Sequence, residues 1–139
     1  ITGGGDADLI NGDAGNDTLE GGDGADTLRG GANDDSLDGG AGNDGLSGAG
    51  GNDFLLGNSD DDTIYGGSGD DALLGSGGND TVVGGGGSDT VRGNGGTDVL
   101  VGGSGTGAAD AGDNFPDAVA GEIDENFMQM PLPGWVEEV

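Results

Sequence analysis

The chain has 139 residues, 38 of them glycine, and a formal net charge of −26. It contains no Cys, His or Lys, which excludes disulfides, Cys/His zinc sites, Ser-His-Asp triads, cysteine nucleophiles and Schiff-base lysines. The negative charge argues against nucleic acid and anionic membranes as partners, and no apolar run approaches the roughly 18 residues of a membrane span.

A nine-residue repeat runs through residues 1–106. Each unit has an aspartate at the same position, a glycine five residues before it and an aliphatic residue two residues after it. The aspartates are Asp8, Asp17, Asp26, Asp35, Asp44, Asp53, Asp62, Asp71, Asp80, Asp89 and Asp98. The aliphatic residues are Ile10, Leu19, Leu28, Leu37, Leu46, Leu55, Ile64, Leu73, Val82, Val91 and Leu100. This period predicts a repeat architecture that pairs a metal-ligand side chain with a core-filling one.

The first six positions of the unit G-G-x-G-x-D-x-U-x, where U is a large aliphatic residue, resemble a turn. Glycine there suits a backbone with positive φ. At the fourth position, the only replacements for glycine are Asp6, Asn33 and Asp60. Asp and Asn are the residue types other than glycine that best tolerate the left-handed region. The second position is looser, which predicts a weaker dihedral constraint. Its replacements are Asp13, Ala49, Asn58, Ser76 and Asn94.

The last three positions, x-U-x, predict a three-residue strand. Side chains alternate faces along a strand, so U points inward and its two neighbours point outward. So short a strand is not stable alone, and stacked units are needed to bury the U residues as one continuous apolar column. The predicted fold class is therefore all-β.

These residues resemble the RTX, or haemolysin-type, calcium-binding nonapeptide, from Gly3 to about Val101. The resemblance implies a right-handed parallel β-roll solenoid, with two nonapeptides per coil and Ca²⁺ held between successive turns on the same edge. It implies that one turn supplies its Asp and the carbonyls of its second and fourth positions. The turn 18 residues later supplies its own Asp and the carbonyls of its first and third positions. One such site would contain Gly22, Gly24, Asp26, Gly39, Ala41 and Asp44.

An all-oxygen ligand set suits Ca²⁺, which prefers six to eight oxygens in flexible geometry. Pairing each Asp with the one 18 residues later predicts about nine complete sites, from Asp8/Asp26 to Asp80/Asp98. A tenth site at Asp89 is expected to be weak, because Gly107 stands where its partner Asp would be. Expected backbone ligands include Gly21, Gly22, Asp23, Gly24, Gly39, Gly40, Ala41, Gly42, Gly57, Ser59, Gly66, Gly67, Ser68, Gly69, Gly75, Gly77, Gly84, Gly85, Gly86 and Gly87.

Two alternatives stay open for the repeat block. In the first, each Asp caps its own turn without binding metal. In the second, the chain is a glycine-rich, disordered acidic linker, a description that also suits the calcium-free state. The residues beside U become apolar in the later units, which predicts an exposed apolar patch that docks an upstream domain or a second copy. This patch contains Phe54, Leu56, Tyr65, Leu74, Val83, Val99 and Val101.

Residues 107–139 form a tail without the repeat. Asn114–Pro116 is expected to open a short helix and Trp135 to anchor the tail on the roll. Either the tail packs on one sheet and caps the open end of the solenoid, or it becomes ordered only with a partner. The acidic and apolar ending Trp135–Val139 is compatible with the type I secretion signal that the resemblance implies.

The function predicted from the sequence is calcium binding by a secreted bacterial module that folds outside the cell. Calcium-driven folding would support type I secretion and the extracellular stability of a larger protein. Because Ile1 stands inside a repeat, we expect the chain to be part of something longer, and we expect no catalytic residue within it. The alternatives are an accessory module of a secreted protease, lipase or polysaccharide-modifying enzyme, and a calcium-dependent adhesin, surface-layer or matrix component.

Overall fold

The computed structural model describes residues 1–102, which form twelve β-strands. The strands are β1 (Thr2–Gly4), β2 (Leu9–Ala14), β3 (Thr18–Asp23), β4 (Thr27–Ala32), β5 (Ser36–Ala41), β6 (Gly45–Gly50), β7 (Phe54–Ser59), β8 (Thr63–Ser68), β9 (Ala72–Gly77), β10 (Thr81–Gly86), β11 (Thr90–Gly95) and β12 (Val99–Val101). The short helix, the anchoring Trp and the cap that the sequence predicts for the tail lie outside these residues.

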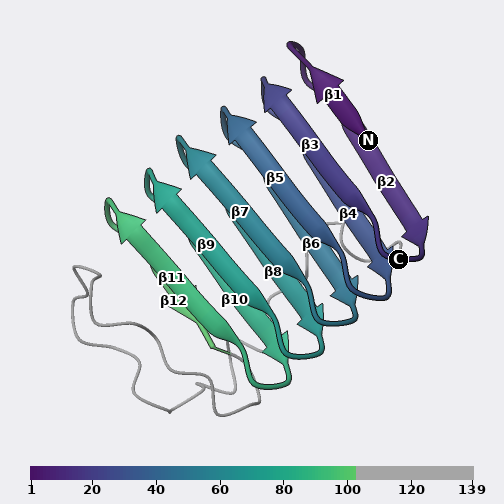
Figure 1. Ribbon diagram of the computed structural model, residues 1–139. Coiled ribbons are helices and arrows are strands. Elements are labelled where there is room, and N and C mark those ends of the chain that lie inside the picture. Colours follow the sequence, from purple (N-terminus) through teal and green to yellow (C-terminus); the bar gives the residue numbers. More distant parts are fainter. Residues whose placement is uncertain (103–139) are drawn as a thin grey trace.

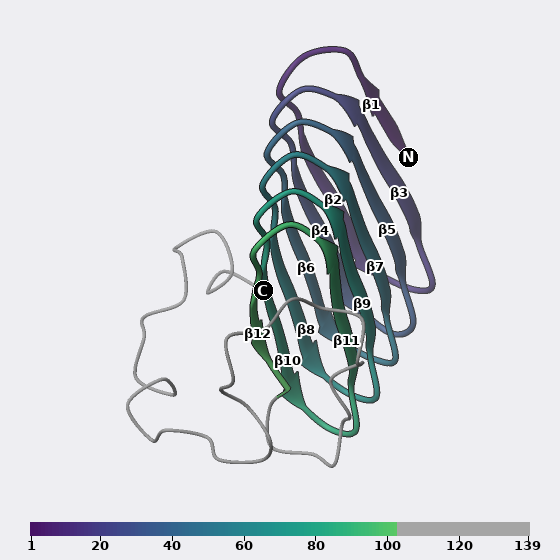
Figure 2. The ribbon, with the colours of Figure 1, turned by 90° about the vertical axis from the view of Figure 1, so that its left-hand side faces the viewer.

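Two parallel sheets of six strands each face one another, and the chain alternates between them (Figure 1). The odd-numbered strands form one sheet and the even-numbered strands form the other, so each coil adds one strand to each sheet (Figure 2). Leu37 pairs with Leu19 on one side and with Leu55 on the other. Neighbouring strands are therefore 18 residues apart, which confirms the parallel solenoid with two nonapeptides per coil.

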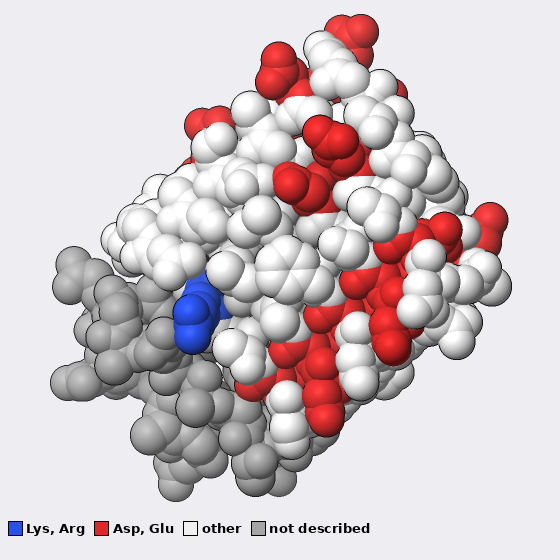
Figure 3. Space-filling view, in the orientation of Figure 1, with Lys and Arg blue, Asp and Glu red and all other residues white. Residues whose placement is uncertain are grey.

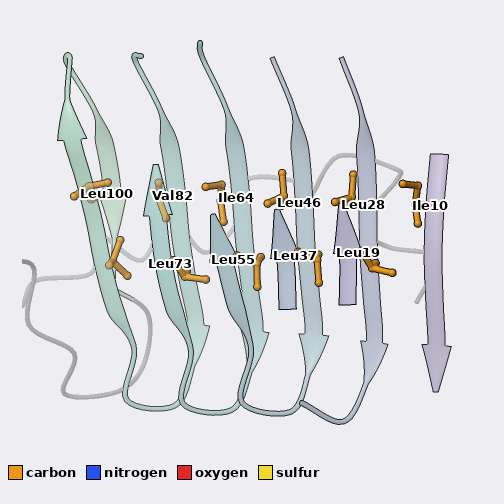
Figure 4. Close-up of a cluster of buried hydrophobic side chains, with 11 residues drawn as sticks. Ile10, Leu19, Leu28, Leu37, Leu46, Leu55, Ile64, Leu73, Val82 and Leu100 are labelled. Carbon is orange, nitrogen blue, oxygen red and sulfur yellow. The ribbon is translucent and has the colours of Figure 1, made fainter. Parts of the chain in front are cut away.

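Among residues 1–102, the hydrophobic core lies between the two sheets and consists of the U residues alone. Their side chains point from both sheets into one narrow apolar layer (Figure 4). Every U residue from Leu19 to Val82 is fully buried, and the terminal ones, Ile10 and Leu100, are only 6% and 4% exposed. The sequence prediction that U faces inward is confirmed.

Most strands are six residues long rather than three, so the predicted strand length was wrong. In β3, Leu19 and Gly21 are both buried while Glu20 between them is exposed. The first glycine of each unit therefore continues the inward alternation that U begins. Strand pairing extends through the next two positions as well, and the turn is reduced to the fourth, fifth and sixth positions.

The second position of the unit has positive φ in every coil, so the weaker dihedral constraint inferred from its variability was wrong. Ala49 and Ser76 adopt φ of 80° and 87°, although neither residue type favours this region. At the fourth position, Asn33 and Asp60 have φ of 82° and 76°, as predicted. Asp6 does not adopt positive φ, so the prediction of a left-handed backbone at the fourth position is wrong for that residue.

The outward apolar residues are divided between the sheets as alternation predicted. Phe54 and Leu56 lie on β7 and Leu74 on β9, in the odd-numbered sheet. The even-numbered sheet carries Tyr65, Val83, Val99 and Val101. Phe54 and Val99 are 45% and 48% exposed, and the others are half-buried. Among residues 1–102, no helix is long and apolar enough to cross a membrane.

Candidate metal centre

The repeat aspartates stand in two columns, one along each edge of the roll. Each directly precedes a strand, and from Asp17 onward each is the last residue of a three-residue turn. The turns from even-numbered to odd-numbered strands hold Asp17, Asp35, Asp53, Asp71 and Asp89. The opposite turns hold Asp8, Asp26, Asp44, Asp62, Asp80 and Asp98. A stripe of acidic side chains is visible along one edge in Figure 3.

Within each column, the backbone N–H of an aspartate donates to Oδ1 of the aspartate 18 residues later. The Asp26 N–H lies 2.8 Å from Asp44 Oδ1, and the Asp53 N–H lies 2.8 Å from Asp71 Oδ1. The same bond joins every Asp pair from Asp8/Asp26 to Asp80/Asp98, with lengths of 2.7–3.0 Å. The structure therefore stacks the pairs that the sequence predicted to share a site.

The second carboxylate oxygen, Oδ2, has no hydrogen-bond donor although it is buried. This holds for Asp17, Asp26, Asp35, Asp44, Asp53, Asp62, Asp71, Asp80 and Asp89. An unsatisfied buried carboxylate oxygen is costly, and nine in regular register require an explanation. A cation bound beside the column would provide one.

The first-position glycine creates the space around each Oδ2 atom. A Cβ atom on Gly12 would lie 2.7 Å from Asp17 Oδ2 and 2.6 Å from the Gly30 carbonyl oxygen. Asp44 Oδ2 and the Gly57 carbonyl oxygen approach the Cβ position of Gly39 in the same way, at 2.5 and 3.0 Å. Glycine is needed here because a Cβ would fill the point where an Asp oxygen and a carbonyl oxygen converge, and not because of positive φ.

The expected backbone ligands lie in the first four positions of their units, beside the Asp columns. A Cβ on Gly40 would meet the Gly22 carbonyl oxygen, so second-position carbonyls point toward the next coil. Fourth-position carbonyls do likewise, since a Cβ on Gly42 would meet the Gly24 oxygen. The third-position carbonyl of Ala41 accepts a hydrogen bond from the Gly24 N–H at 2.7 Å. Its second lone pair stays available for a metal.

No group of three or more carboxylates that could hold a metal by side chains alone occurs within residues 1–102. A cation at an edge would therefore need the backbone carbonyls together with the stacked aspartates. Both ligand types are hard oxygen donors, and such a set fits Ca²⁺.

Burial raises the pKa of seven of the column aspartates when no metal is bound. Loss of hydration raises the pKa of Asp62 to about 7; the Asp44 N–H bond lowers it, and the charges of Asp44 and Asp80 raise it further. The pKa of Asp44 and that of Asp53 are each raised to about 6, with loss of hydration as the largest cause. Asp35, Asp71, Asp80 and Asp89 shift in the same direction for the same main reason. A nearby cation would reverse this effect, because opposite charge favours the ionised form.

Sequence reasoning missed the fifth position, which it treated as an arbitrary residue. The side-chain oxygen of Asn52 accepts a hydrogen bond from the Asp70 N–H at 2.9 Å, and other units repeat this contact. A compositional signal was present: apart from Ala7 and Ala25, every fifth position carries a side-chain oxygen. These residues are Asn16, Asp34, Asn43, Asn52, Asp61, Asp70, Asn79, Ser88 and Thr97.

The family model described as RTX calcium-binding nonapeptide repeat (4 copies) matches the chain in overlapping segments. The matched residues are 1–19, 12–46, 20–55, 47–82 and 74–107. No curated protein and no solved structure matches the chain.

Proposed function

Because the chain belongs to the RTX calcium-binding nonapeptide repeat family, we propose that its stacked turns bind Ca²⁺ and that this binding drives folding of the roll. The proposal rests above all on the nine buried Oδ2 atoms that have no donor. Their regular register favours metal ligation over simple turn capping, because a carboxylate that only capped turns would leave no reason for a buried Oδ2 without a donor in every unit.

Each proposed site lies between two turns of the same edge. For the Asp26/Asp44 pair, the earlier turn contributes Asp26 and the carbonyls of Gly22 and Gly24. The later coil contributes Asp44 and the carbonyls of Gly39 and Ala41. The direction of the Gly22 and Gly24 carbonyls and the stacking of the two carboxylates support this ligand set.

Charge explains why folding would depend on the cation. The chain carries a formal net charge of −26, and the roll stacks its repeat aspartates in two columns. About nine Ca²⁺ ions, one for each stacked pair, would offset most of that charge while supplying a partner to each buried oxygen. The many glycines add a large entropic cost of folding, which metal binding would also offset.

We propose that this module belongs to a larger secreted bacterial protein. An unfolded, highly charged chain suits passage through a type I exporter at low cytosolic calcium, and binding outside the cell would then favour the folded roll. The roll itself would be a folding and stabilising element, and any catalytic residues of the protein would lie in another domain.

A calcium titration followed by far-UV circular dichroism tests the proposal, with Mg²⁺ as the control. We expect a cooperative change from coil to β-structure with Ca²⁺ alone, because Mg²⁺ demands octahedral geometry and retains its waters. A spectrum that is already rich in β-structure with chelator present would show that folding does not depend on calcium.

A second candidate function is calcium-dependent docking, favoured by the exposed apolar side chains of Phe54 and Val99. Large exposed apolar residues over the later coils suit an upstream enzyme domain or a second copy in an adhesin, surface layer or matrix. Sedimentation velocity with and without calcium distinguishes these partners. Self-association should appear only with calcium and should be lost in Phe54→Ser, whereas docking of an upstream domain leaves the isolated roll monomeric.

A further inference from the structure

The fifth-position side chains form a second ladder of hydrogen bonds beside the aspartate column. On one edge, the Asn52 N–H donates to Asp34 Oδ1 at 2.8 Å, and the Asp70 N–H donates to Asn52 Oδ1 at 2.9 Å. The Ser88 N–H continues the ladder to Asp70 Oδ1 at 2.8 Å. Each of these residues is exposed, so this ladder lies on the outer rim of the turns.

The opposite edge repeats the arrangement with different residues. The Asp61 N–H donates to Asn43 Oδ1 at 3.3 Å, and the Asn79 N–H donates to Asp61 Oδ1 at 2.7 Å. The Thr97 N–H then donates to Asn79 Oδ1 at 3.0 Å. The ladder is therefore a property of the repeat and not of one turn.

The two ladders run in opposite directions along the roll. A sixth-position Asp accepts from the turn before it, as when Asp71 Oδ1 accepts from the Asp53 N–H. A fifth-position residue accepts from the turn after it, as when Asn52 Oδ1 accepts from the Asp70 N–H. Where the fifth position carries an acceptor, as between the turns of Asn52 and Asp70, two reciprocal bonds join neighbouring turns and fix both their spacing and their relative rotation.

Charge alternates along the fifth-position ladder. Asn52 stands between Asp34 and Asp70 on one edge, and Asp61 stands between Asn43 and Asn79 on the other. No two carboxylates are adjacent in either ladder. Asn provides the same acceptor oxygen as Asp without a charge, so the alternation keeps the bonds while limiting like-charge repulsion beside the aspartate columns.

We propose that the fifth-position residues are positioning residues for the calcium sites: they hold two successive turns at the separation that ligation requires. This role rests on the proposed function, because it concerns the same turns. Asn52 would set the site between Asp53 and Asp71, since its side chain joins those two turns. Ala25 offers no acceptor to the turn of Asn43, so the Asp26/Asp44 site would lack this support.

Calcium release into excess chelator, resolved by stopped flow, tests the role in the full chain. Asn52→Ala should leave the number of bound ions unchanged but release one ion about two- to tenfold faster, the change expected for one lost hydrogen bond. Asn52→Asp keeps the acceptor and adds a charge. It should release that ion at the parent rate in about 0.5 M NaCl, where the added charge is strongly screened. Ala25→Asn adds an acceptor and should slow the release of one ion.

The outcomes separate this role from the proposed function. If the parent chain binds no calcium, both proposals are overturned. If the parent binds calcium and Asn52→Ala releases every ion at the parent rate, the positioning role alone is overturned. Faster release of all ions together would show a contribution to global stability only, and it would also overturn the role. The positioning role is also overturned if Asn52→Asp releases the ion as fast as Asn52→Ala in high salt.

Discussion

The backbone N–H of Asp53 donates to Oδ1 of Asp71, 2.8 Å away and 18 residues later in the chain. Asp53 Oδ1 accepts the equivalent bond from the Asp35 N–H. One residue therefore connects three successive turns of the same edge, while its Oδ2 atom is buried without a donor. A single substitution in the column should consequently affect two proposed sites at once.

Asp53→Ala should reduce the number of bound calcium ions by about two, because each proposed site takes one carboxylate from each turn. The cooperativity of calcium-induced folding should fall as well. Isothermal titration calorimetry gives the stoichiometry, and circular dichroism gives the transition.

Asp23→Ala is the matched control for this measurement. It removes the same charge from an exposed third position, where Ala14, Ala32 and Ala41 occur naturally. The control should keep the parent stoichiometry. An Asp53→Ala chain that binds as many ions as the parent would refute the pairing of aspartates 18 residues apart.

Leu55→Asp should prevent folding even at saturating calcium. Leu55 is fully buried in the apolar layer, and an unpaired charge there costs on the order of several kcal/mol. Circular dichroism at millimolar calcium measures the effect. Phe54→Asp, at the neighbouring outward position that is 45% exposed, is the control and should fold.

Gly48→Ala should weaken calcium binding and destabilise the roll by about 1–3 kcal/mol. A Cβ on Gly48 would meet Asp53 Oδ2 and would lie 2.7 Å from the Gly66 carbonyl oxygen, where the proposed site takes its ligands. Gly77→Ala is the control, since the nearest atom to its Cβ, the Asn58 carbonyl oxygen, is 3.5 Å away. Urea unfolding with calcium present should separate the variants, and equal stability of the two would contradict the close approach at the first position.

The metal-free roll should be more stable in acid. The pKa of Asp62 in the folded roll is about 7 and that of Asp44 about 6, both above the ordinary value of 3.8. A group whose pKa rises on folding stabilises the folded state below its unfolded pKa, and that contribution is lost as pH rises through the folded pKa. In chelator, β-structure should therefore increase as pH falls from about 7 to about 4.

Circular dichroism across this pH range, at low protein concentration, checks the direction of the change. Calcium should show the opposite dependence, because protons compete for the same carboxylates. Its apparent affinity should decrease as the solution is acidified. If the β-structure of the chelated chain increased with rising pH, that result would contradict the burial of the column aspartates and the raised pKa that follows from it.

Much of the fold could be predicted from the chain because the nine-residue period repeats a single local pattern. The inward column of U residues and the division of Phe54, Leu56 and Tyr65 between two sheets follow from alternation alone. The dihedral requirement at the second position could not be inferred from residue types. Ala49 and Ser76 occupy the left-handed region there although their side chains disfavour it, because strand pairing on both sides imposes that conformation.

The sequence by itself determined the repeat, the residues of the core and the aspartates that stack along each edge, because side-chain chemistry at a fixed period is a local property. Only the tertiary structure decided which atoms of successive coils come into contact. The convergence of Asp17 Oδ2 and the Gly30 carbonyl oxygen beside Gly12, and the bond from the Asp70 N–H to Asn52, join residues on different coils. Such contacts depend on how closely two coils approach, and that distance is set by the ladders and the core of the folded roll.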